Sequence, residues 1–277
     1  MAAPLGLHDL SADAVRALLQ TRTLGWALHI LEETDSTNTA ALALAQQGAG
    51  HGTVVAADRQ TAGRGRLGRR WFSPPGENLY CSVILRRTPP GDRRWDDVSW
   101  LPLISAVAAA RAIRTVTGLN SLLKWPNDIL IGQRKVGGLL CEGGGTSSQS
   151  AYVVVGIGIN VNTRRESFPE DLRDLASSLR SETGRQVNRA ALLAGWLSEL
   201  EGQCDALWAE RREEIGREYT SLCSTLGHRV RVSLAGGQVV EGLADSLGPN
   251  GSLKIKRDGD ETGPLIEIHA GDVVHLR

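Results

Sequence analysis

The sequence predicts an α+β fold, in which a mixed β-sheet flanked by helices is followed by a small C-terminal β-barrel. Two observations predict this. Apolar, β-branched runs alternate with helical patterns over roughly the first 225 residues, and short strands separated by glycine turns fill the remainder. A length of 277 residues suits one medium-sized domain plus a small one. We therefore expect a larger domain over 1–226 and a small barrel over 227–277.

Helices and strands alternate in the expected larger domain. Ser11 can cap a short amphipathic helix over 11–20, and Gly48 ends an Ala/Leu-rich helix over 39–47. Further helical patterns cover 98–116, which Gly118 ends, and 190–219, which reads as one long helix or two. Apolar, β-branched runs predict strands at 26–31, 53–57, 79–85, 122–125, 129–131, 135–142 and 152–159, with a small-residue turn at 143–150.

The C-terminal part has the pattern of a small all-β unit. Short strands are predicted at 229–234, 238–243, 252–256, 265–269 and 273–276. Glycine-rich turns lie between them at 236–237, 248–251 and 258–259. Five short strands in about 50 residues favour a small β-barrel.

Composition and charge narrow the function classes. Hydrophobic residues make up 41% and charged residues 22%, as in ordinary globular proteins, so global disorder is excluded. Lys plus Arg and Asp plus Glu both number 31, which excludes attraction of the whole surface to nucleic acid or to an anionic membrane. A basic site must therefore be local.

The cysteines and the N-terminus favour a reducing, cytoplasmic location without membrane association. Cys81, Cys141, Cys204 and Cys223 show neither C-x-x-C nor zinc-site spacing, so we expect reduced thiols. Residues 1–10 lack the pattern of a signal peptide, and the longest apolar run, 101–110, is too short to span a bilayer.

The segment 58–71 carries the strongest chemical signal. Its glycines alternate with arginines, so the backbone can approach a phosphate closely while guanidinium groups bind anionic oxygens. Such a loop can bind a polyphosphate and stabilise charge that develops on it. Taken alone, the loop fits a solvated basic loop or an RGG-like nucleic-acid contact equally well. It lacks the Walker pattern, and Gly156-Ile157-Gly158 lacks the third glycine of a dinucleotide fingerprint.

Four further motifs accompany the loop in a fixed order. Asp35-Ser36-Thr37-Asn38 precedes it, and Lys124-Trp125-Pro126-Asn127-Asp128, Lys135 to Glu142 (K-x-x-G-x-L-x-E) and Gly156 to Asn160 (G-x-G-x-N) follow it. Together the five motifs, which span 34–162, closely resemble the biotin–protein ligase family. The resemblance implies a class II synthetase-like catalytic domain and an SH3-like C-terminal barrel.

The resemblance also implies an activity. Members of that family make biotinyl-5′-AMP from biotin and ATP with Mg²⁺, and then pass the biotinyl group to a specific lysine of a biotin carboxyl carrier protein. No side chain is expected to form a covalent intermediate, because the adenylate is the activated species. The Arg/Gly loop is then expected to order over the adenylate and exclude water.

Carried over residue by residue, the resemblance assigns site residues. The biotin-binding residues would be Ser36, Thr37, Asn38, Gln60, Arg64, Gly65, Arg66, Lys135, Gly137 and Gly156. The nucleotide-binding residues would be Arg64, Arg66, Arg69, Trp71, Lys124, Asn127 and Asn160. Lys135, Arg64 and Arg66 would be catalytic, and Asp128 would help to hold Mg²⁺.

Several assignments have a structural alternative that the sequence leaves open. Ser36 and Thr37 could simply cap a helix, and Lys135 could be a surface lysine at a strand start. Lys124 to Asp128 could be a tight turn, and Gly137 and Gly156 could serve sheet packing.

Two alternatives to the function remain open, a lipoate-type ligase on the same fold and a nucleic-acid-binding module that uses the Arg/Gly loop. The R-G-R loop and the K-W-P-N-D motif argue against the first, and few Tyr and Phe argue against the second. Only about 33 residues precede the first motif, fewer than a winged helix-turn-helix needs, so we expect a ligase without specific DNA binding. The resemblance leaves homodimerisation through sheet edges open.

Overall fold

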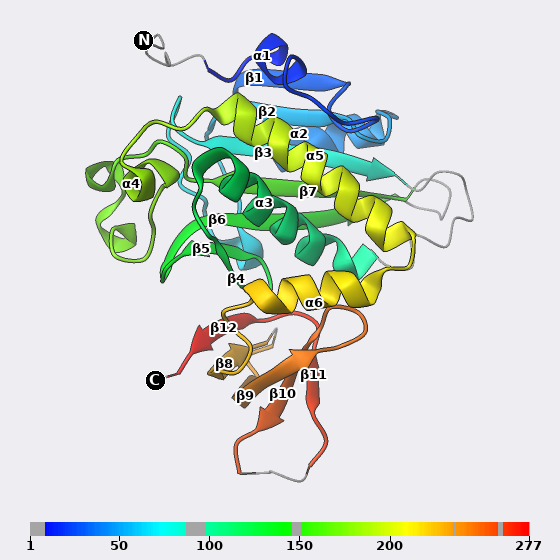
Figure 1. Ribbon diagram of the computed structural model, residues 1–277, viewed down its shortest axis with the longest axis vertical. Coiled ribbons are helices and arrows are strands. Elements are labelled where there is room, and N and C mark those ends of the chain that lie inside the picture. The colour runs from blue at the N-terminus through cyan, green and yellow to red at the C-terminus, as the bar shows by residue number, and fades with distance from the viewer. Residues whose placement is uncertain (1–8, 87–97, 146–150, 235, 260–262, 277) are drawn as a thin grey trace.

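Seven strands form one mixed sheet at the centre of the molecule (Figure 1). The computed structural model describes residues 9–86, 98–145, 151–234, 236–259 and 263–276. The strands are β1 (Leu28–Thr34), β2 (Val54–Gln60), β3 (Leu79–Arg86), β4 (Leu122–Lys124), β5 (Asp128–Ile131), β6 (Arg134–Gly144) and β7 (Tyr152–Ile159). Their order is β1-β2-β3-β7-β6-β5-β4, and β1 pairs with β2 in parallel while the other neighbours are antiparallel. The predicted mixed sheet is confirmed.

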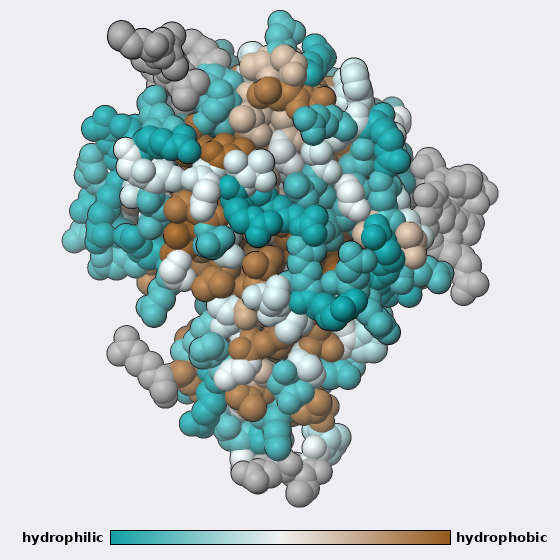
Figure 2. Space-filling view, viewed as in Figure 1, coloured by the Kyte–Doolittle hydropathy of each residue, from teal (hydrophilic) through white to brown (hydrophobic). Residues whose placement is uncertain are grey.

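Helices cover both faces of this sheet. The helices α3 (Leu101–Thr117) and α5 (Arg189–Trp208) pack on one face, and α2 (Thr37–Gln46) packs on the other (Figure 1). Because successive side chains of a strand point to opposite faces, Val54 and Ala56 join the larger core with α3 and α5, whereas Val55 packs towards α2. The outer side of α3 and α5 is mainly hydrophilic, with apolar side chains in smaller patches (Figure 2).

The remaining helices differ from the predicted ranges. Helix α1 (Ala12–Arg16) is shorter than expected, because the amides of Leu18 and Leu19 donate to carbonyls three residues back, as in a turn. The predicted 190–219 helix is two helices, α5 and α6 (Arg212–Leu222), separated at Glu210, whose φ of 59° ends the helical path. A short helix, α4 (Leu179–Thr183), was not predicted. Of the turn expected over 143–150, residues 146–150 lie outside the described residues.

The C-terminal part is a five-stranded antiparallel sheet. Its strands are β8 (Arg229–Ser233), β9 (Val239–Leu247), β10 (Leu253–Arg257), β11 (Ile266–Ile268) and β12 (Asp272–His275). The order β11-β10-β9-β8-β12 leaves two edges, so the predicted barrel is barrel-like but not closed in the described residues.

The C-terminal sheet packs directly against the larger part of the chain. The indole N–H groups of Trp100 and Trp125 donate to the carbonyls of Pro249 and Gly251, at 2.9 and 3.1 Å. Buried Val230 and its neighbours in the sheet belong to the same hydrophobic cluster as α3 and α5. The change from the mixed sheet to the antiparallel sheet falls near residue 226, as expected. That the two parts are separate domains stays a prediction. Among the described residues, no helix is long and apolar enough to cross a membrane.

A buried carboxylate, Glu201 of α5, binds the segment that precedes β1 and predicts acid-dependent stability. Burial raises the pKa of Glu201, but hydrogen bonds from the amides of Arg22, Thr23 and Leu24 outweigh it and lower the pKa to about 2. Since the folded pKa lies below the ordinary value of 4.5, this stabilisation is present above that value. It is lost as the pH falls towards the folded pKa.

We therefore expect Glu201→Gln to lower the free energy of unfolding by about 2 kcal/mol near neutral pH. The difference from the unmodified protein should shrink as the pH falls from about 5 to about 3. Urea unfolding across this range measures both. Glu214→Gln, at an exposed ion pair with Arg211, is the control and should change stability little. A difference between Glu201→Gln and the unmodified protein that does not depend on pH would contradict the assignment.

Candidate active site

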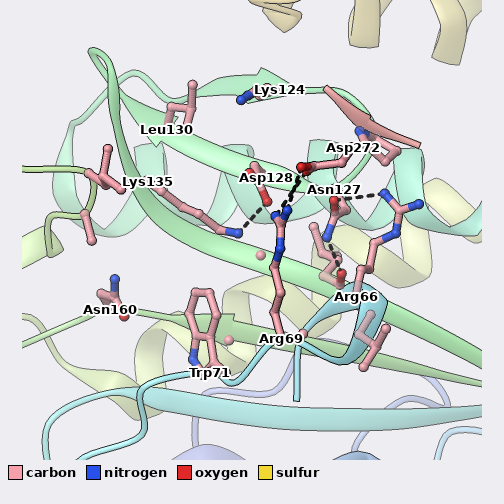
Figure 3. A pocket seen from close by; sticks show the side chains of 18 of the residues that line it. Arg66, Arg69, Trp71, Lys124, Asn127, Asp128, Leu130, Lys135, Asn160 and Asp272 are labelled. Carbon is pink, nitrogen blue, oxygen red and sulfur yellow. Dashed lines mark hydrogen bonds and ion pairs between the residues drawn. The ribbon is translucent and has the colours of Figure 1, made fainter. Parts of the chain in front are cut away.

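One cavity of about 890 Å³ opens between the central sheet, the Arg/Gly loop and the C-terminal sheet (Figure 3). Its lining comes from the start of α2, the 60–72 loop, β4 to β7 and the C-terminal strand β12. The cavity brings together the predicted site residues Ser36, Thr37, Asn38, Gln60, Arg64, Gly65, Arg66, Arg69, Trp71, Lys124, Asn127, Asp128, Lys135, Gly156 and Asn160. Gly137 lies outside the lining, in the ladder between β5 and β6, and its neighbour Gly138 lines the cavity instead.

Asn38 is fixed at the floor of the cavity. Its Nδ2 donates to Leu140 O at 3.1 Å and to Glu142 Oε2 at 2.7 Å, and Ser82 Oγ lies 2.6 Å from its Oδ1. A Cβ atom on Gly156 would stand 2.0 Å from Asn38 Oδ1. Gly156 is therefore a glycine because the buried amide of Asn38 occupies the space of a side chain.

Thr37 and Gln60 form a polar wall beside this floor. The amide of Thr37 donates to Gln60 Oε1 at 2.8 Å, and Gln60 Nε2 donates to Ser73 Oγ at 3.1 Å. Ser36 is the N-cap residue of α2, but its side chain makes no capping hydrogen bond. This end of the cavity offers fixed donors and acceptors suited to a neutral polar ring.

The Arg/Gly loop is a compact turn. The amide of Trp71 donates to Gly63 O at 2.9 Å, and the amide of Gly65 donates to Arg69 O at 2.7 Å. Leu67 has left-handed backbone angles, φ 56° and ψ 33°, which are unfavourable for a leucine. Its side chain is 66% exposed, so burial does not compensate for this strain.

Two arginines of the loop pair with carboxylates on the cavity wall. Arg64 Nη2 donates to Glu142 Oε2 at 2.8 Å. Arg69 makes a two-point ion pair with Asp272 of β12, at 3.1 and 2.5 Å.

Arg66 lies deeper in the site. Its Nη1 reaches Asn127 Oδ1 at 3.3 Å and Gly271 O at 3.4 Å, and burial lowers its pKa although Asp128 and Asp272 oppose the shift. Figure 3 shows Arg66 and Arg69 pointing from the loop towards this wall. The loop is thus held against the C-terminal sheet.

Lys135 points into the cavity between an acid and an aromatic ring (Figure 3). Its Nζ lies 2.6 Å from Asp128 Oδ1 and 5.3 Å from the centre of the Trp71 ring. The indole in turn packs on Gly158, where a Cβ atom would stand 2.6 Å from Nε1. Lys135 is therefore a half-buried, oriented cation rather than a free surface lysine.

The segment 124–128 is both a tight turn and a wall of the cavity. Asn127 Nδ2 donates to Leu139 O at 2.8 Å, and the amide of Leu139 donates back to Asn127 O at 2.9 Å. The amide of buried Trp125 donates to Thr225 Oγ1 at 3.0 Å. On the far side of the cavity, Asn160 Nδ2 donates to Ser177 O at 3.0 Å.

Sequence reasoning missed two parts of the lining. One is an apolar end formed by Phe168, Leu172, Leu175 and Ala176. The other is the C-terminal wall formed by His228, Gly271, Asp272, Val273, His275 and Leu276. Neither group has a motif spacing, and fold topology alone brings them to the loop.

Comparison with known proteins agrees with this geometry. The model of the biotin/lipoate A/B protein ligase family matches residues 30–160. The chain is 34% identical to the biotin–[acetyl-CoA-carboxylase] ligase of Mycobacterium tuberculosis, over 96% of this chain and 98% of the relative. It is 39% identical over 184 residues to the bifunctional ligase/repressor BirA of Bacillus subtilis, a match that spans 66% of this chain but only 55% of that relative's length.

The fold has a close counterpart among solved structures. The biotin protein ligase of Aquifex aeolicus, solved in complex with biotin and ATP, superposes with a TM-score of 0.76 and 30% identity, over 91% of this chain and 99% of that one. The matches to the Mycobacterium tuberculosis and Aquifex aeolicus ligases each cover more than nine-tenths of the two chains compared, so they extend beyond the motif region into the C-terminal sheet. The chain therefore belongs to the biotin protein ligase family.

Proposed function

We propose that this protein joins biotin to AMP, releases pyrophosphate, and then transfers the biotinyl group to a lysine of a biotin carboxyl carrier protein. The observation that carries the proposal is the single cavity in which a fixed polar wall, Lys135 and the Arg/Gly loop meet. Family membership supports the same activity, because the matched relative from Aquifex aeolicus was solved with biotin and ATP.

The first step brings two anions together. An oxygen of the biotin carboxylate attacks the α-phosphorus of ATP, and the bond to the β-phosphate oxygen breaks as pyrophosphate leaves. Lys135 is the cation best placed to offset this charge, since Asp128 and the Trp71 ring hold it in the cavity. Arg66, which burial leaves weakly solvated, supplies a second positive charge.

The second step needs no covalent intermediate on the protein. The neutral amine of the acceptor lysine attacks the acyl carbon, the bond to AMP breaks, and the amine loses a proton. Before that attack the loop has to keep water away from the mixed anhydride. The contacts of Arg66 and Arg69 with the C-terminal sheet support such a closure, because they join the loop to the opposite wall.

The site fits Mg²⁺ held mainly by phosphate oxygens. Magnesium needs only one or two carboxylates when a polyphosphate is present, and Asp128 offers one on the cavity wall. The described residues contain no cluster of three His, Cys, Asp or Glu side chains that could hold a metal by themselves. Asp128 Oδ1 pairs with Lys135, so the ion would be contacted through Asp128 Oδ2 and would neutralise phosphate charge.

Biotin-dependent exchange between ATP and labelled pyrophosphate tests the proposal. The purified protein with Mg²⁺ should support exchange with biotin, and lipoate should not replace it. Exchange with lipoate alone would favour the lipoate-type ligase. A well-folded protein with no exchange would overturn the proposal and return the Arg/Gly loop to the class of nucleic-acid contacts.

Loss of the Arg69–Asp272 ion pair should loosen the closed loop. We expect Asp272→Asn to release biotinyl-5′-AMP several-fold faster while adenylate formation changes less, because the loop loses its two-point contact with β12. Rapid filtration of enzyme loaded with labelled adenylate measures the release. Asp258→Asn breaks an Arg–Asp pair with Arg229 in the same sheet and is the control. Equal release from both variants would remove the closure role.

A further inference from the structure

The cavity continues past the loop to the junction between the central and C-terminal sheets. Three basic side chains from separate elements meet there. Lys124 ends β4, His228 precedes β8, and His275 ends β12, and all three line the cavity. Figure 3 shows Lys124 and Asp272 at one end of the site and Asn160 at the other. We refer to these three side chains as the seam cluster.

The two histidines of the seam cluster are held by each other and by neutral oxygens. Their rings lie nearly parallel, with centroids 5.5 Å apart and an angle of 10° between the planes. His275 Nε2 lies 3.4 Å from Thr225 Oγ1, and His228 Nδ1 lies 3.3 Å from Leu226 O. Each contact therefore uses one ring nitrogen and leaves the second nitrogen of the ring for another partner.

No carboxylate neutralises the seam cluster in the described part of the chain. Asp128 stands opposite Lys124 in the β4–β5 ladder, but its carboxylate is 2.6 Å from Lys135. Asp272, three residues before His275 on β12, is paired with Arg69. Burial lowers the pKa of His275, and Lys124 and His228 lower it further. Protonation of His275 beside Lys124 and His228 is thus unfavourable unless an anion binds in the cavity.

Resting on the proposed function, we propose that Lys124, His228 and His275 bind the pyrophosphoryl group, both as the β- and γ-phosphates of ATP and as free pyrophosphate. This group carries most of the negative charge of the reactants. The opposite end of the cavity, with Phe168, Leu172 and Leu175, suits an apolar or aromatic group instead. Arg66 and Arg69 reach Gly271 and Asp272 near the seam cluster, so they would hold the α-phosphate next to the pyrophosphoryl group.

The proposal has a consequence for protonation. An anion in contact with His275 raises its pKa from the lowered value in the free protein, so binding takes up a proton. Binding of the pyrophosphoryl group should therefore strengthen as the pH falls from about 8 to about 6. The phosphates and Mg²⁺ also respond to pH. Dividing each KM of the unmodified protein by the KM of His275→Gln at the same pH cancels the contribution of the phosphates and of Mg²⁺.

The experiment compares His275→Gln and His228→Gln with His269→Gln in the full-length protein. His269 is an exposed histidine of the same sheet outside the cavity lining and is the matched control. Two arms separate the sources of the phosphate. The KM for ATP is measured in biotin-dependent adenylate formation, and the KM for pyrophosphate in the reverse, exchange direction.

Both seam variants should raise both KM values about tenfold, as expected for a lost hydrogen bond to a charged group. The binding of biotin and of AMP should stay unchanged, and the ratio to the unmodified protein should grow as the pH falls. His269→Gln should match the unmodified protein throughout. A rise in the ATP arm alone would limit the subsite to bound nucleotide and overturn the claim for free pyrophosphate.

Unchanged KM values in both arms, in variants that melt within a few degrees of the unmodified protein, would overturn the inference. Equal loss of biotin, AMP and pyrophosphate binding would do the same, because it would indicate a structural role for the histidines. Failure of the proposed function is distinguishable from either result, since the unmodified protein would then show no biotin-dependent exchange at all.

Discussion

Lys135→Ala is expected to lower kcat for adenylate formation by about 100-fold or more, the scale on which loss of one transition-state donor acts. The side chain is 34% exposed and its ammonium group is held 2.6 Å from Asp128 Oδ1, inside the cavity. Charge accumulates on the carboxylate and phosphate oxygens as they approach, so this cation should matter most in the transition state. Single-turnover formation of labelled biotinyl-5′-AMP at saturating ATP and biotin measures the effect.

Two further variants test whether the position and shape of the Lys135 charge cause the effect. Lys135→Arg preserves the charge but replaces a compact ammonium with a planar fork, so partial activity is expected. Lys256→Ala removes a lysine of the C-terminal sheet that does not line the cavity, and it should leave kcat unchanged. A Lys135→Ala protein that folds normally and turns over at the original rate would remove this lysine from the mechanism.

The motif residues could be predicted from the sequence because each position tolerates few residue types. Gly156 carries no side chain since Asn38 fills the space, and the loop at 63–71 folds back on itself through its own backbone. Such constraints leave short, ordered patterns. The sheet and most of its strands were likewise predictable from continuous apolar runs, in which consecutive residues such as Val54, Val55 and Ala56 are buried on both faces.

The side-chain contacts that the motif residues make with distant parts of the chain could not be predicted. Arg69 reaches Asp272 across 203 positions of the chain, and Arg66 reaches the carbonyl of Gly271. A single aspartate at a strand start has no spacing that distinguishes it from a solvated one. The sequence left one long helix or two open over 190–219, and the point of division could not be placed, because it depends on a left-handed Glu210 and not on a glycine or proline.

A second large effect is expected from Arg189, a buried cation that pairs with two carboxylates. Its side chain is 1% exposed, and it pairs with Asp9 at 2.6 Å and with Asp58 at 2.7 Å. We expect Arg189→Met to lower the free energy of unfolding by about 3–5 kcal/mol, because it leaves the carboxylate of Asp9 buried without its counter-charge. Urea unfolding near neutral pH measures the change.

The comparison with an exposed pair decides whether burial is the cause. Arg165 pairs with Asp174 at 2.9 Å, but these side chains are 58% and 91% exposed, so Arg165→Met should change stability by about 0.5 kcal/mol or less. Asp9→Asn in the Arg189→Met background should recover part of the loss, since it removes the uncompensated charge. If the two arginine variants lost similar stability, desolvation of Asp9 would not explain the effect. Because Asp58 begins the 58–71 segment, Arg189 also links Asp9 to the base of the Arg/Gly loop.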